Sequence, residues 1–451
     1  MNNIPEDILL YILSFVDKID ILNFSLTSKK NHKIIKYNKS IFDHSIKIYT
    51  ENIKDIENTI FKVDLHILNL NNIKRKDYEI CYRYINNINS ILIDYGNIIL
   101  DNRILKLFNS VDKLYLYNLN IKDSNYLSHC KYLKLISCLQ IKDISNIKNI
   151  IDLDISNSHF IDLKSMYNLK FLKKLKISNS KNISDISQFN NITTLEELNL
   201  SNCENLYKIY SPLFYIKNLN LSFCNNLYDI TELGNSINLK ILDISYCNNI
   251  VDISNLKNIS DINISNCYKI TDIKSLLNCQ KINLSNCISL YDINILFESV
   301  NLLDLNLKCC TNISYITSMI NLQRLNLSYC KNIYNIYPIL NCKNILYLNL
   351  SGCINIKDVS PLINIKNIDL SFNQNIKDIS MLKNVEVLNI NYCINIYNIY
   401  PLKSLKELRF EGNRLKKLDT NKLPLLDTIY LKDSKYKINI IISKNIKFIY
   451  N

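Results

Sequence analysis

The chain has 15 cysteines among its 451 residues, and they are its most reactive side chains. Most of them form a row with a spacing of 20 to 23 residues, in which serine or asparagine sometimes takes the same place: Cys138, Ser158, Ser180, Cys203, Cys224, Cys247, Cys267, Cys287, Cys310, Cys330, Cys353, Asn373 and Cys393. Zinc sites need four converging ligands, and serine and asparagine do not replace cysteine in them. Small hydrogen-bonding groups suit a repeated bend where backbone carbonyls turn inward. The row therefore predicts a structural ladder, not a set of disulfides or a metal site.

Other side chains that could perform catalysis are few and show no catalytic spacing. The 5 histidines are His32, His44, His66, His129 and His159, and none belongs to an H-E-x-x-H motif. With only 4 glycines, the chain contains neither a G-x-x-x-x-G-K-[ST] loop nor a G-x-G-x-x-G loop for nucleotides. We therefore expect a protein that is not an enzyme and that binds no cofactor.

The basic charge of the chain is spread out. There are 54 Lys and Arg residues against 41 Asp and Glu, a net charge of +13, and the lysines are scattered along the whole sequence. Nucleic-acid-binding proteins more often gather basic residues in one stripe, so nucleic acid is not the expected partner. No signal peptide is evident, and no apolar run of ~18 residues predicts a membrane span. These features predict reduced thiols and a cytoplasmic or nuclear location.

The cysteine row belongs to a longer pattern, L-x-x-L-x-L-x-x-C, in which Ile often replaces Leu. The second apolar position of this pattern recurs every 19 to 23 residues from Leu68 to Ile429, a typical period of leucine-rich repeats. One repeat cannot bury its own apolar residues, whereas stacked repeats share a continuous core. The pattern predicts an α/β solenoid, with a junction of irregular repeats over residues 46–110 and regular repeats over residues 111–451.

Each repeat predicts a short strand followed by a tight return. In one copy, Leu242 and Ile244 alternate as in a half-buried strand. The next apolar residues, Ile250, Ile253 and Leu256, are three apart, which suits 3-10 turns. Stacked units of this kind predict a horseshoe with a parallel β-sheet on the concave face and mainly 3-10 and turn structure on the convex face.

Residues 1–45 have a different pattern, that of a small helical module. Apolar residues recur at helical spacing from Ile8 to Val16, after Pro5, which suits the first turn of a helix. A second helix is predicted after Asp20, and a third short helix over residues 34–37. Three short helices bury little apolar surface, so the module needs the solenoid or a partner against it.

This segment resembles an F-box. The resemblance rests on I-P-E-D-I-L-L-Y-I-L-S-F-V at residues 4–16 and D-I-L-N-F-S-L-T-S-K-K at residues 20–30, with Ile4 in place of the usual Leu. The Trp often found near the end of the motif is replaced by Ile41 and Phe42. The resemblance implies binding to the Skp-type adaptor of a cullin–RING ubiquitin ligase, through Pro5, Ile8, Leu9, Ile12, Leu13 and Leu22.

The whole chain thus resembles the F-box/leucine-rich-repeat proteins, whose repeats hold a substrate. The resemblance implies a non-catalytic subunit that recruits a target protein to the ligase. A scaffold or decoy that binds host protein or nucleic acid without any ligase stays open as an alternative. The abundance of Asn, Ile and Lys also resembles proteins of giant DNA viruses of amoebae and of other AT-rich genomes.

Strand alternation predicts which side chains face outward from the sheet. The positions between the second and third apolar residues are almost all Asn or Asp, and Ser follows two residues on, so we expect hydrogen-bonded ladders with little specificity. Aromatic residues and Arg at more variable positions are typical interface anchors. We expect target contacts from the concave face at Phe223, Tyr246, Arg324, Tyr329, Tyr347, Phe372 and Tyr392, with Phe223 and Tyr246 on adjacent strands.

Overall fold

The structure is a computed structural model that describes residues 45–49, 62–67, 88–94, 109, 111–121, 124–158, 163–167, 169–413, 415, 417–431, 439–442 and 446–450. The helical module predicted over residues 1–45 lies outside these residues, apart from residue 45 itself. The chain divides into two compact units: residues 1–182 with 189–200 form unit 1, and residues 183–188 with 201–451 form unit 2. Within the described ranges, no helix is long and apolar enough to cross a membrane.

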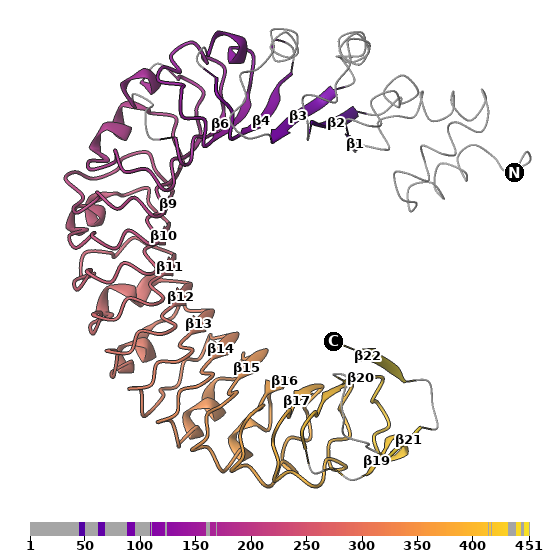
Figure 1. Ribbon diagram of the computed structural model, residues 1–451. Helices are drawn as coiled ribbons and strands as arrows, with labels where there is room; N and C mark the ends of the chain where they lie inside the picture. The colour runs from indigo at the N-terminus through magenta and orange to yellow at the C-terminus, as the bar shows by residue number, and fades with distance from the viewer. Residues whose placement is uncertain are drawn as a thin grey trace, which may run out of the picture. The chain divides into compact units, whose positions relative to one another are not determined.

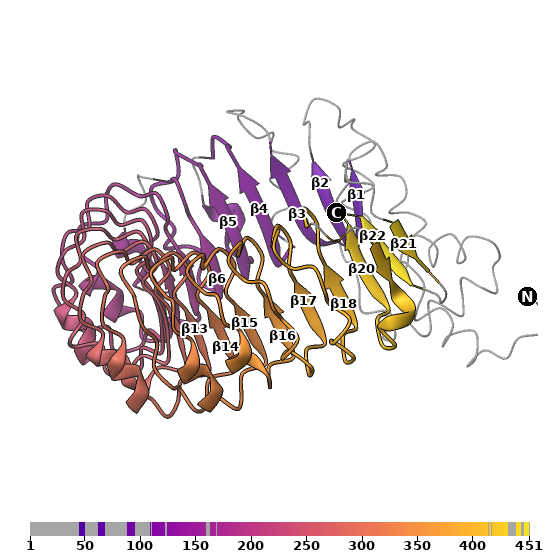
Figure 2. The same ribbon diagram turned by 90° about the horizontal axis from the view of Figure 1, so that it is seen from below.

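Unit 1 is a parallel sheet whose described strands pair in chain order, side by side in Figure 2. The strands are β1 (Ser45–Tyr49), β2 (Lys62–Ile67), β3 (Ile88–Asp94), β4 (Lys113–Tyr117), β5 (Tyr132–Ile136), β6 (Asp152–Asp154), β7 (Lys174–Lys176) and β8 (Glu197–Asn199). The 3-10 helices η5 (Asn125–Leu127), η6 (Leu163–Met166) and η7 (Ser187–Asn191) lie in the returns. Strands therefore alternate with tight returns, as the repeat pattern predicts.

Unit 2 continues the same alternation, and its main sheet is also parallel. Its strands are β9 (Asn218–Asn220), β10 (Ile241–Asp243), β11 (Asp261–Asn263), β12 (Lys281–Asn283), β13 (Asp304–Asn306), β14 (Arg324–Asn326), β15 (Tyr347–Asn349), β16 (Asn367–Asp369), β17 (Val387–Asn389), β18 (Glu407–Arg409), β20 (Thr428–Leu431) and β22 (Lys447–Tyr450). A separate pair is formed by β19 (Lys417–Asp419) and β21 (Asn439–Ile441).

The returns of unit 2 contain further 3-10 helices: η8 (Thr231–Asn235), η9 (Lys274–Asn278), η10 (Asn294–Glu298), η11 (Tyr337–Asn341), η12 (Ser360–Leu362) and η13 (Thr420–Lys422). Within this unit the strands line the inner side of a curved stack and the returns lie on the outer side (Figure 1). The predicted fold class, a solenoid with a parallel sheet and 3-10 returns, is confirmed.

The apolar positions of each repeat stack on those of its neighbours. Leu242 is 1% exposed and stands opposite Leu219 on one side and Ile262 on the other. Burying one such side chain contributes about 1.5–3 kcal/mol, so a stack of them can hold strands of only three residues together. In the return, the Leu256 N–H donates to the Ile253 carbonyl at 3.0 Å, an i→i+3 bond that explains the threefold apolar spacing.

The cysteine row forms a ladder inside the stack. Cys310 Sγ donates to the Leu284 carbonyl of the preceding repeat at 3.0 Å. Where asparagine takes the same place, Asn373 Nδ2 donates to the Leu350 carbonyl at 2.7 Å. The described cysteines are all free. The predicted structural ladder is confirmed at these places, because the side chains satisfy carbonyls that turn inward. The buried Ser180 hydroxyl, in the same row, has no hydrogen-bond partner among the described residues.

Asparagine joins neighbouring repeats along two further rows in the returns. Asn332 Nδ2 donates to the Thr311 carbonyl at 2.8 Å, and Asn321 Nδ2 donates to the Val300 carbonyl at 2.7 Å. Similar bonds recur in several other repeats. The abundance of asparagine therefore has a structural use, because its amide reaches a backbone acceptor one repeat away.

Candidate interaction surface

The outward face of the strands carries the uniform polar rows that the repeat pattern predicts. Asn263 Nδ2 donates to Asp243 Oδ2 at 3.0 Å, and Asn283 Nδ2 donates to Asn263 Oδ1 at 2.9 Å. The Ser245 hydroxyl and N–H donate to Asp243 Oδ1 at 2.6 and 2.9 Å. The prediction of hydrogen-bonded ladders is confirmed. Because these groups are engaged with one another, we expect the positions that break the rows to contribute most of the selectivity for a partner.

The aromatic residues before the cysteine row lie in turns, not on strands. Strand β9 ends at Asn220 and β10 at Asp243, whereas Phe223 and Tyr246 follow with φ angles of +62° and +61°. The prediction that these two lie on adjacent strands is wrong. A left-handed backbone recurs at this place in other repeats of unit 2, at Asn202, Asn266, Asn286, Cys309, Tyr329, Gly352, Phe372, Tyr392 and Gly412. For an L-residue this conformation costs roughly 1–2 kcal/mol, so the aromatic residues stand there against a backbone preference.

The rings themselves come together in pairs at this turn. The ring centroids of Phe223 and Tyr246 are 4.3 Å apart, with planes inclined by 10°. Those of Phe372 and Tyr392 are 4.9 Å apart and inclined by 14°. Together with Tyr329, these side chains are 36% to 44% exposed. They form an aromatic edge at the ends of the strands, which we define as Phe223, Tyr246, Tyr329, Phe372 and Tyr392.

Two glycines make room for this aromatic edge. A Cβ atom on Gly352 would lie 2.6 Å from Tyr329 Cδ1, and one on Gly412 would meet the ring of Tyr392. Both glycines have a left-handed backbone, with φ of +67° and +69°. Each ring therefore lies over the backbone of the next repeat, at a place where only glycine leaves the space free.

A Gly352→Ala variant should be destabilised by about 2 kcal/mol or more. The alanine costs roughly 1–2 kcal/mol in backbone strain and also displaces the Tyr329 ring. The urea midpoint of unfolding, followed by circular dichroism, measures the loss. Repeating the substitution in a Tyr329→Asn background separates the two causes, because asparagine removes the ring and tolerates the left-handed turn. An equal loss in both backgrounds would show that the ring contact contributes nothing.

The other two target candidates, Arg324 and Tyr347, lie on the outward face of adjacent strands. The Arg324 guanidinium carbon is 5.1 Å from the centroid of the Tyr347 ring, and its Nε is 3.4 Å from Asp304 Oδ2. Strands β14 and β15 place the two residues directly opposite each other. The structure therefore brings this pair together, at a different place from the aromatic edge.

A hollow on the same face begins at Tyr347 and extends to β20. It has a volume of about 260 Å³ and is lined by Tyr347, Asn367, Ile368, Asp369, Val387, Leu388, Asn389, Glu407, Arg409 and Tyr430. The Arg409 guanidinium carbon lies 4.2 Å from the centroid of the Tyr430 ring. Neither Arg409 nor Tyr430 was predicted as a site residue. The sequence did offer a signal for them, because both residues break the row of Asn and Asp at the third position of their strands.

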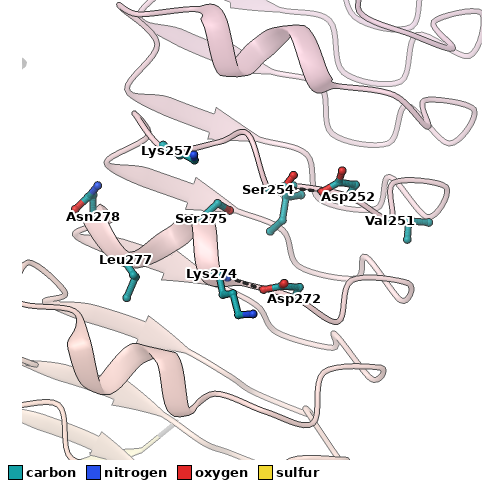
Figure 3. A pocket seen from close by; sticks show the side chains of 10 residues that line it. Val251, Asp252, Ser254, Lys257, Asp272, Lys274, Ser275, Leu277 and Asn278 are labelled. Atoms are coloured by element: carbon teal, nitrogen blue, oxygen red, sulfur yellow. Dashed lines mark hydrogen bonds between the residues drawn. The ribbon is translucent and has the colours of Figure 1, made fainter.

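A second hollow lies among the returns (Figure 3). It has a volume of about 380 Å³ and includes two carboxylates and two lysines. Asp252 Oδ1 accepts from the Ser254 N–H at 2.8 Å, and Asp272 Oδ1 accepts from the Lys274 N–H at 2.9 Å. Each carboxylate thus closes its own local turn, so this hollow offers no pair of acidic groups arranged for acid–base work.

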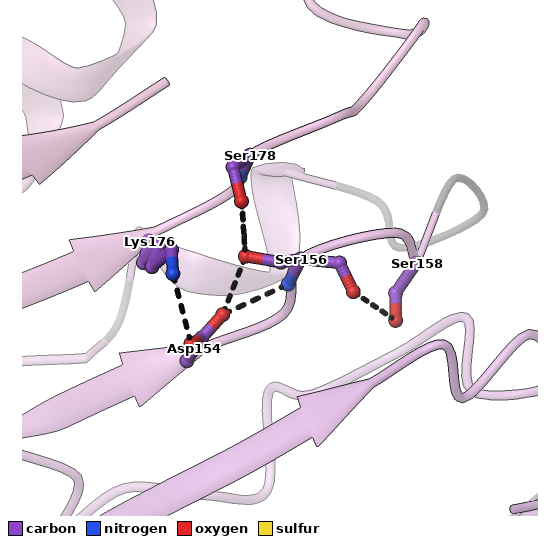
Figure 4. Close-up of polar contacts among 5 residues, drawn as sticks. All are labelled: Asp154, Ser156, Ser158, Lys176 and Ser178. Atoms are coloured by element: carbon purple, nitrogen blue, oxygen red, sulfur yellow. Dashed lines mark hydrogen bonds and ion pairs between the residues drawn. The ribbon is translucent and has the colours of Figure 1, made fainter. Parts of the chain in front are cut away.

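One polar cluster in unit 1 contains the residue types of a catalytic site (Figure 4). Ser156 Oγ donates to Asp154 Oδ1 at 2.6 Å, Ser178 Oγ donates to Ser156 Oγ at 2.7 Å, and Lys176 Nζ is 3.8 Å from Asp154 Oδ2. A nucleophilic serine needs a general base that is free to take its proton. The same serine–aspartate contact recurs at Asp243 in unit 2. The cluster is therefore one rung of the repeat ladder, and no group of His, Cys, Asp and Glu among the described residues is arranged to hold a metal.

Comparison with known proteins gives a family match for the N-terminal segment and structural similarity for the repeats. The F-box domain family matches residues 1–43. No curated protein has a sequence that matches this chain. Among solved structures, a TLR13–ssRNA13 complex is similar with 19% identity and a TM-score of 0.54. The similarity covers 82% of this chain, which spans 57% of the length of that TLR13 chain.

Two bacterial proteins are also similar. An internalin (InlF) of Listeria monocytogenes matches with 21% identity, 75% of this chain, 84% of its own chain and a TM-score of 0.31. A leucine-rich-repeat protein of Leptospira interrogans matches with 18% identity, 74% of this chain, 100% of its own chain and a TM-score of 0.39. F-box domains, the family matched at residues 1–43, are non-catalytic protein-interaction domains. The chain joins an F-box domain at its N-terminus to a leucine-rich-repeat solenoid.

Proposed function

We propose that this protein is a substrate receptor of a Skp–cullin–F-box type ubiquitin ligase. The F-box would bind the Skp-type adaptor through Pro5, Ile8, Leu9, Ile12, Leu13 and Leu22, and the solenoid would bind a protein target. The observation that supports this proposal is an F-box domain match at residues 1–43, ahead of a solenoid that exposes aromatic side chains and the arginines Arg324 and Arg409. Ligase assembly places the receptor in the cytoplasm or nucleus.

In this function the protein contributes proximity and not chemistry. A receptor that binds adaptor and target at once raises the effective concentration of the target at the ligase by orders of magnitude, without any new catalytic group. A long stack of repeats suits this task, because it offers a target an extended surface. The uniform Asn and Asp rows keep the strands in register, and the residues that break the rows supply the contacts.

Affinity capture tests the proposal. The full chain, tagged at its C-terminus, should recover the Skp-type adaptor and a cullin from a eukaryotic lysate, as identified by mass spectrometry. The proposal would be contradicted if neither the adaptor nor a cullin were recovered by a chain that circular dichroism shows to be folded. It would favour the alternative, a ligase-independent scaffold or decoy, whose nucleic-acid version predicts binding to RNA or DNA that weakens strongly from low to physiological salt.

Replacing Phe223 and Tyr246 by Asn should weaken target capture while leaving adaptor capture unchanged. Asparagine suits this test because Asn202 and Asn266 already occupy the same left-handed turn in neighbouring repeats. The double variant therefore removes the stacked rings without new backbone strain, and its thermal stability should not fall. An unchanged yield of any target protein that the wild type recovers would exclude this part of the aromatic edge as an anchor.

A matched control for that experiment is Tyr228→Asn with Tyr291→Asn. These rings are 57% and 62% exposed and lie in the returns, away from the aromatic edge. If this control weakens target capture as strongly, the loss reflects a general change of surface and not a specific anchor.

A further inference from the structure

The hollow between β15 and β20 has large side chains at both ends and small ones between them (Figure 2 shows these strands side by side). Tyr347 stands at one end, and Arg409 with Tyr430 stands at the other. The floor between them is formed at the outward strand positions by Val387 and short polar residues. A hollow of about 260 Å³ with this outline holds one or two side chains of a partner, not a large ligand.

Arg409 is the cation of this region that has no carboxylate partner among the described residues. Arg324 is paired with Asp304, and Lys366 and Lys406 both bind Glu386, at 2.8 and 2.6 Å. Hydrogen bonds from these two lysines lower the pKa of Glu386 to about 2.

The guanidinium of Arg409 is held in place by its neighbours. It stacks on the Tyr430 ring at 4.2 Å, and the Tyr430 hydroxyl donates to Glu407 Oε2 at 3.1 Å, which fixes the ring. Stacking leaves the N–H groups at the edge of the guanidinium free, and these fit a carboxylate with two parallel hydrogen bonds. The side chain is therefore pre-arranged for an anionic group of a partner.

The hollow also contains two carboxylates, and they select the kind of anion. Asp369 accepts hydrogen bonds from Ser371 and Asn389, and Glu407 accepts from Tyr430, so both groups are held at their positions. A nucleic-acid backbone brings a row of phosphates, which these carboxylates would repel. A peptide brings a single carboxylate among neutral groups, and its own N–H groups can donate to Asp369 and Glu407.

We propose that the hollow binds an extended peptide segment of the target that carries a single acidic residue, with one apolar side chain over Val387 beside Tyr347 and one Asp or Glu side chain on Arg409. The inference rests on the proposed function, because the segment would belong to the protein that the receptor recruits. It adds the chemistry of the recognised segment: an apolar residue next to an acidic one.

Selection from a phage-displayed library of random 12-residue peptides on the purified full chain tests this inference. The selected peptides should be enriched in Asp or Glu next to an apolar residue. One synthetic consensus peptide should bind about tenfold more weakly, or weaker still, to the Arg409→Glu variant than to the wild type. Changing the acidic residue of the peptide to the amide should weaken its binding to the wild type by a similar factor. Combining both changes should cost little more than either alone, since the two groups contact each other.

The matched control is Lys281→Glu, which makes the same charge change on the outward face of β12, away from the hollow. Arg409→Lys keeps the charge but loses the paired hydrogen bonds, so it should bind with intermediate strength. Three outcomes would each overturn the inference. The selected peptides could lack acidic residues, or the Lys281→Glu variant could lose as much peptide affinity as Arg409→Glu. The third is tighter binding of a 20-nucleotide oligo-dT than of the peptide. Adaptor capture, measured on the same variants, reports separately on the proposed function.

Discussion

The repeats are expected to unfold steeply once the pH rises above about 9, because buried thiols lie in the ladder and, at Cys130, Cys279 and Cys342, outside it. Burial raises the pKa of Cys138 to about 11, and that of Cys224, Cys287 and Cys353 to about 12, from an ordinary value of 9.0. The pKa is raised, chiefly by burial, at twelve described thiols: Cys130, Cys138, Cys224, Cys247, Cys267, Cys279, Cys287, Cys310, Cys330, Cys342, Cys353 and Cys393.

The sign of the effect follows from which state keeps the protons. Below pH 9 the thiols are protonated in both the folded and the unfolded chain, so the buried thiols contribute their full stability. Between pH 9 and about 12 the unfolded chain releases protons that the folded chain retains, and the free energy of unfolding falls as the pH rises. Each such thiol lowers it by up to about 1.4 kcal/mol per pH unit, so twelve thiols lower it by up to roughly 16 kcal/mol per unit. That exceeds the usual 5–15 kcal/mol stability of a whole domain.

Urea unfolding at pH 7.5 to 10.5, followed by circular dichroism with a reductant present, measures the slope. The comparison variant carries serine at Cys247, Cys267, Cys287 and Cys310, because Ser158 already fills this place and its hydroxyl donates to the Leu135 carbonyl at 2.7 Å. A hydroxyl does not ionise in this range, so the slope should fall by about a third. An unchanged slope would assign the alkaline transition to tyrosine or lysine and not to the ladder.

Much of this ladder can be predicted from the sequence because each rung is specified locally. The exchange of Cys310 for Ser158 or Asn373 at equivalent places indicates a small donor rather than a metal ligand. Alternation at Leu242 likewise predicts the strands. Both inferences depend on periods of 2, 3 and about 20 residues, which most of the described repeats share.

The aromatic edge was placed wrongly because its backbone runs against the preference of its side chains. Phe223 and Tyr246 prefer extended backbone, and read alone they indicate strand. The signal for a left-handed turn lies in the equivalent position of other repeats, which is occupied by Asn202, Asn266 and Gly352. The hollow around Arg409 was missed for another reason: its residues come from several strands, and parallel pairing alone brings them together.

Replacing Leu9 and Ile12 by Asp should reduce adaptor capture to background while the solenoid remains folded. The two residues are three apart and lie on one face of the helix predicted over residues 8–16, which places both charges in the proposed contact with the adaptor. Each substitution loses about 1.5–3 kcal/mol of apolar burial and adds the cost of desolvating a carboxylate, so capture should fall at least a thousandfold. Each repeat is stabilised mainly by its neighbours, so the circular dichroism spectrum and the urea midpoint of the repeats should not change.

The matched control carries Asp at Tyr11 and Ser14, which adds the same charge at the same spacing on the opposite face of that helix. It should retain adaptor capture. Equal loss in both double variants would mean that any charge unfolds the F-box, and the residues proposed to contact the adaptor would then be unsupported. If instead the Leu9 and Ile12 variant lowers the urea midpoint of the solenoid, the F-box and the repeats fold as one cooperative unit. With a lowered midpoint, a loss of adaptor capture would report on the stability of the chain and not on the contact with the adaptor. With an unchanged midpoint, the loss is assigned to the face of the helix that carries Leu9 and Ile12.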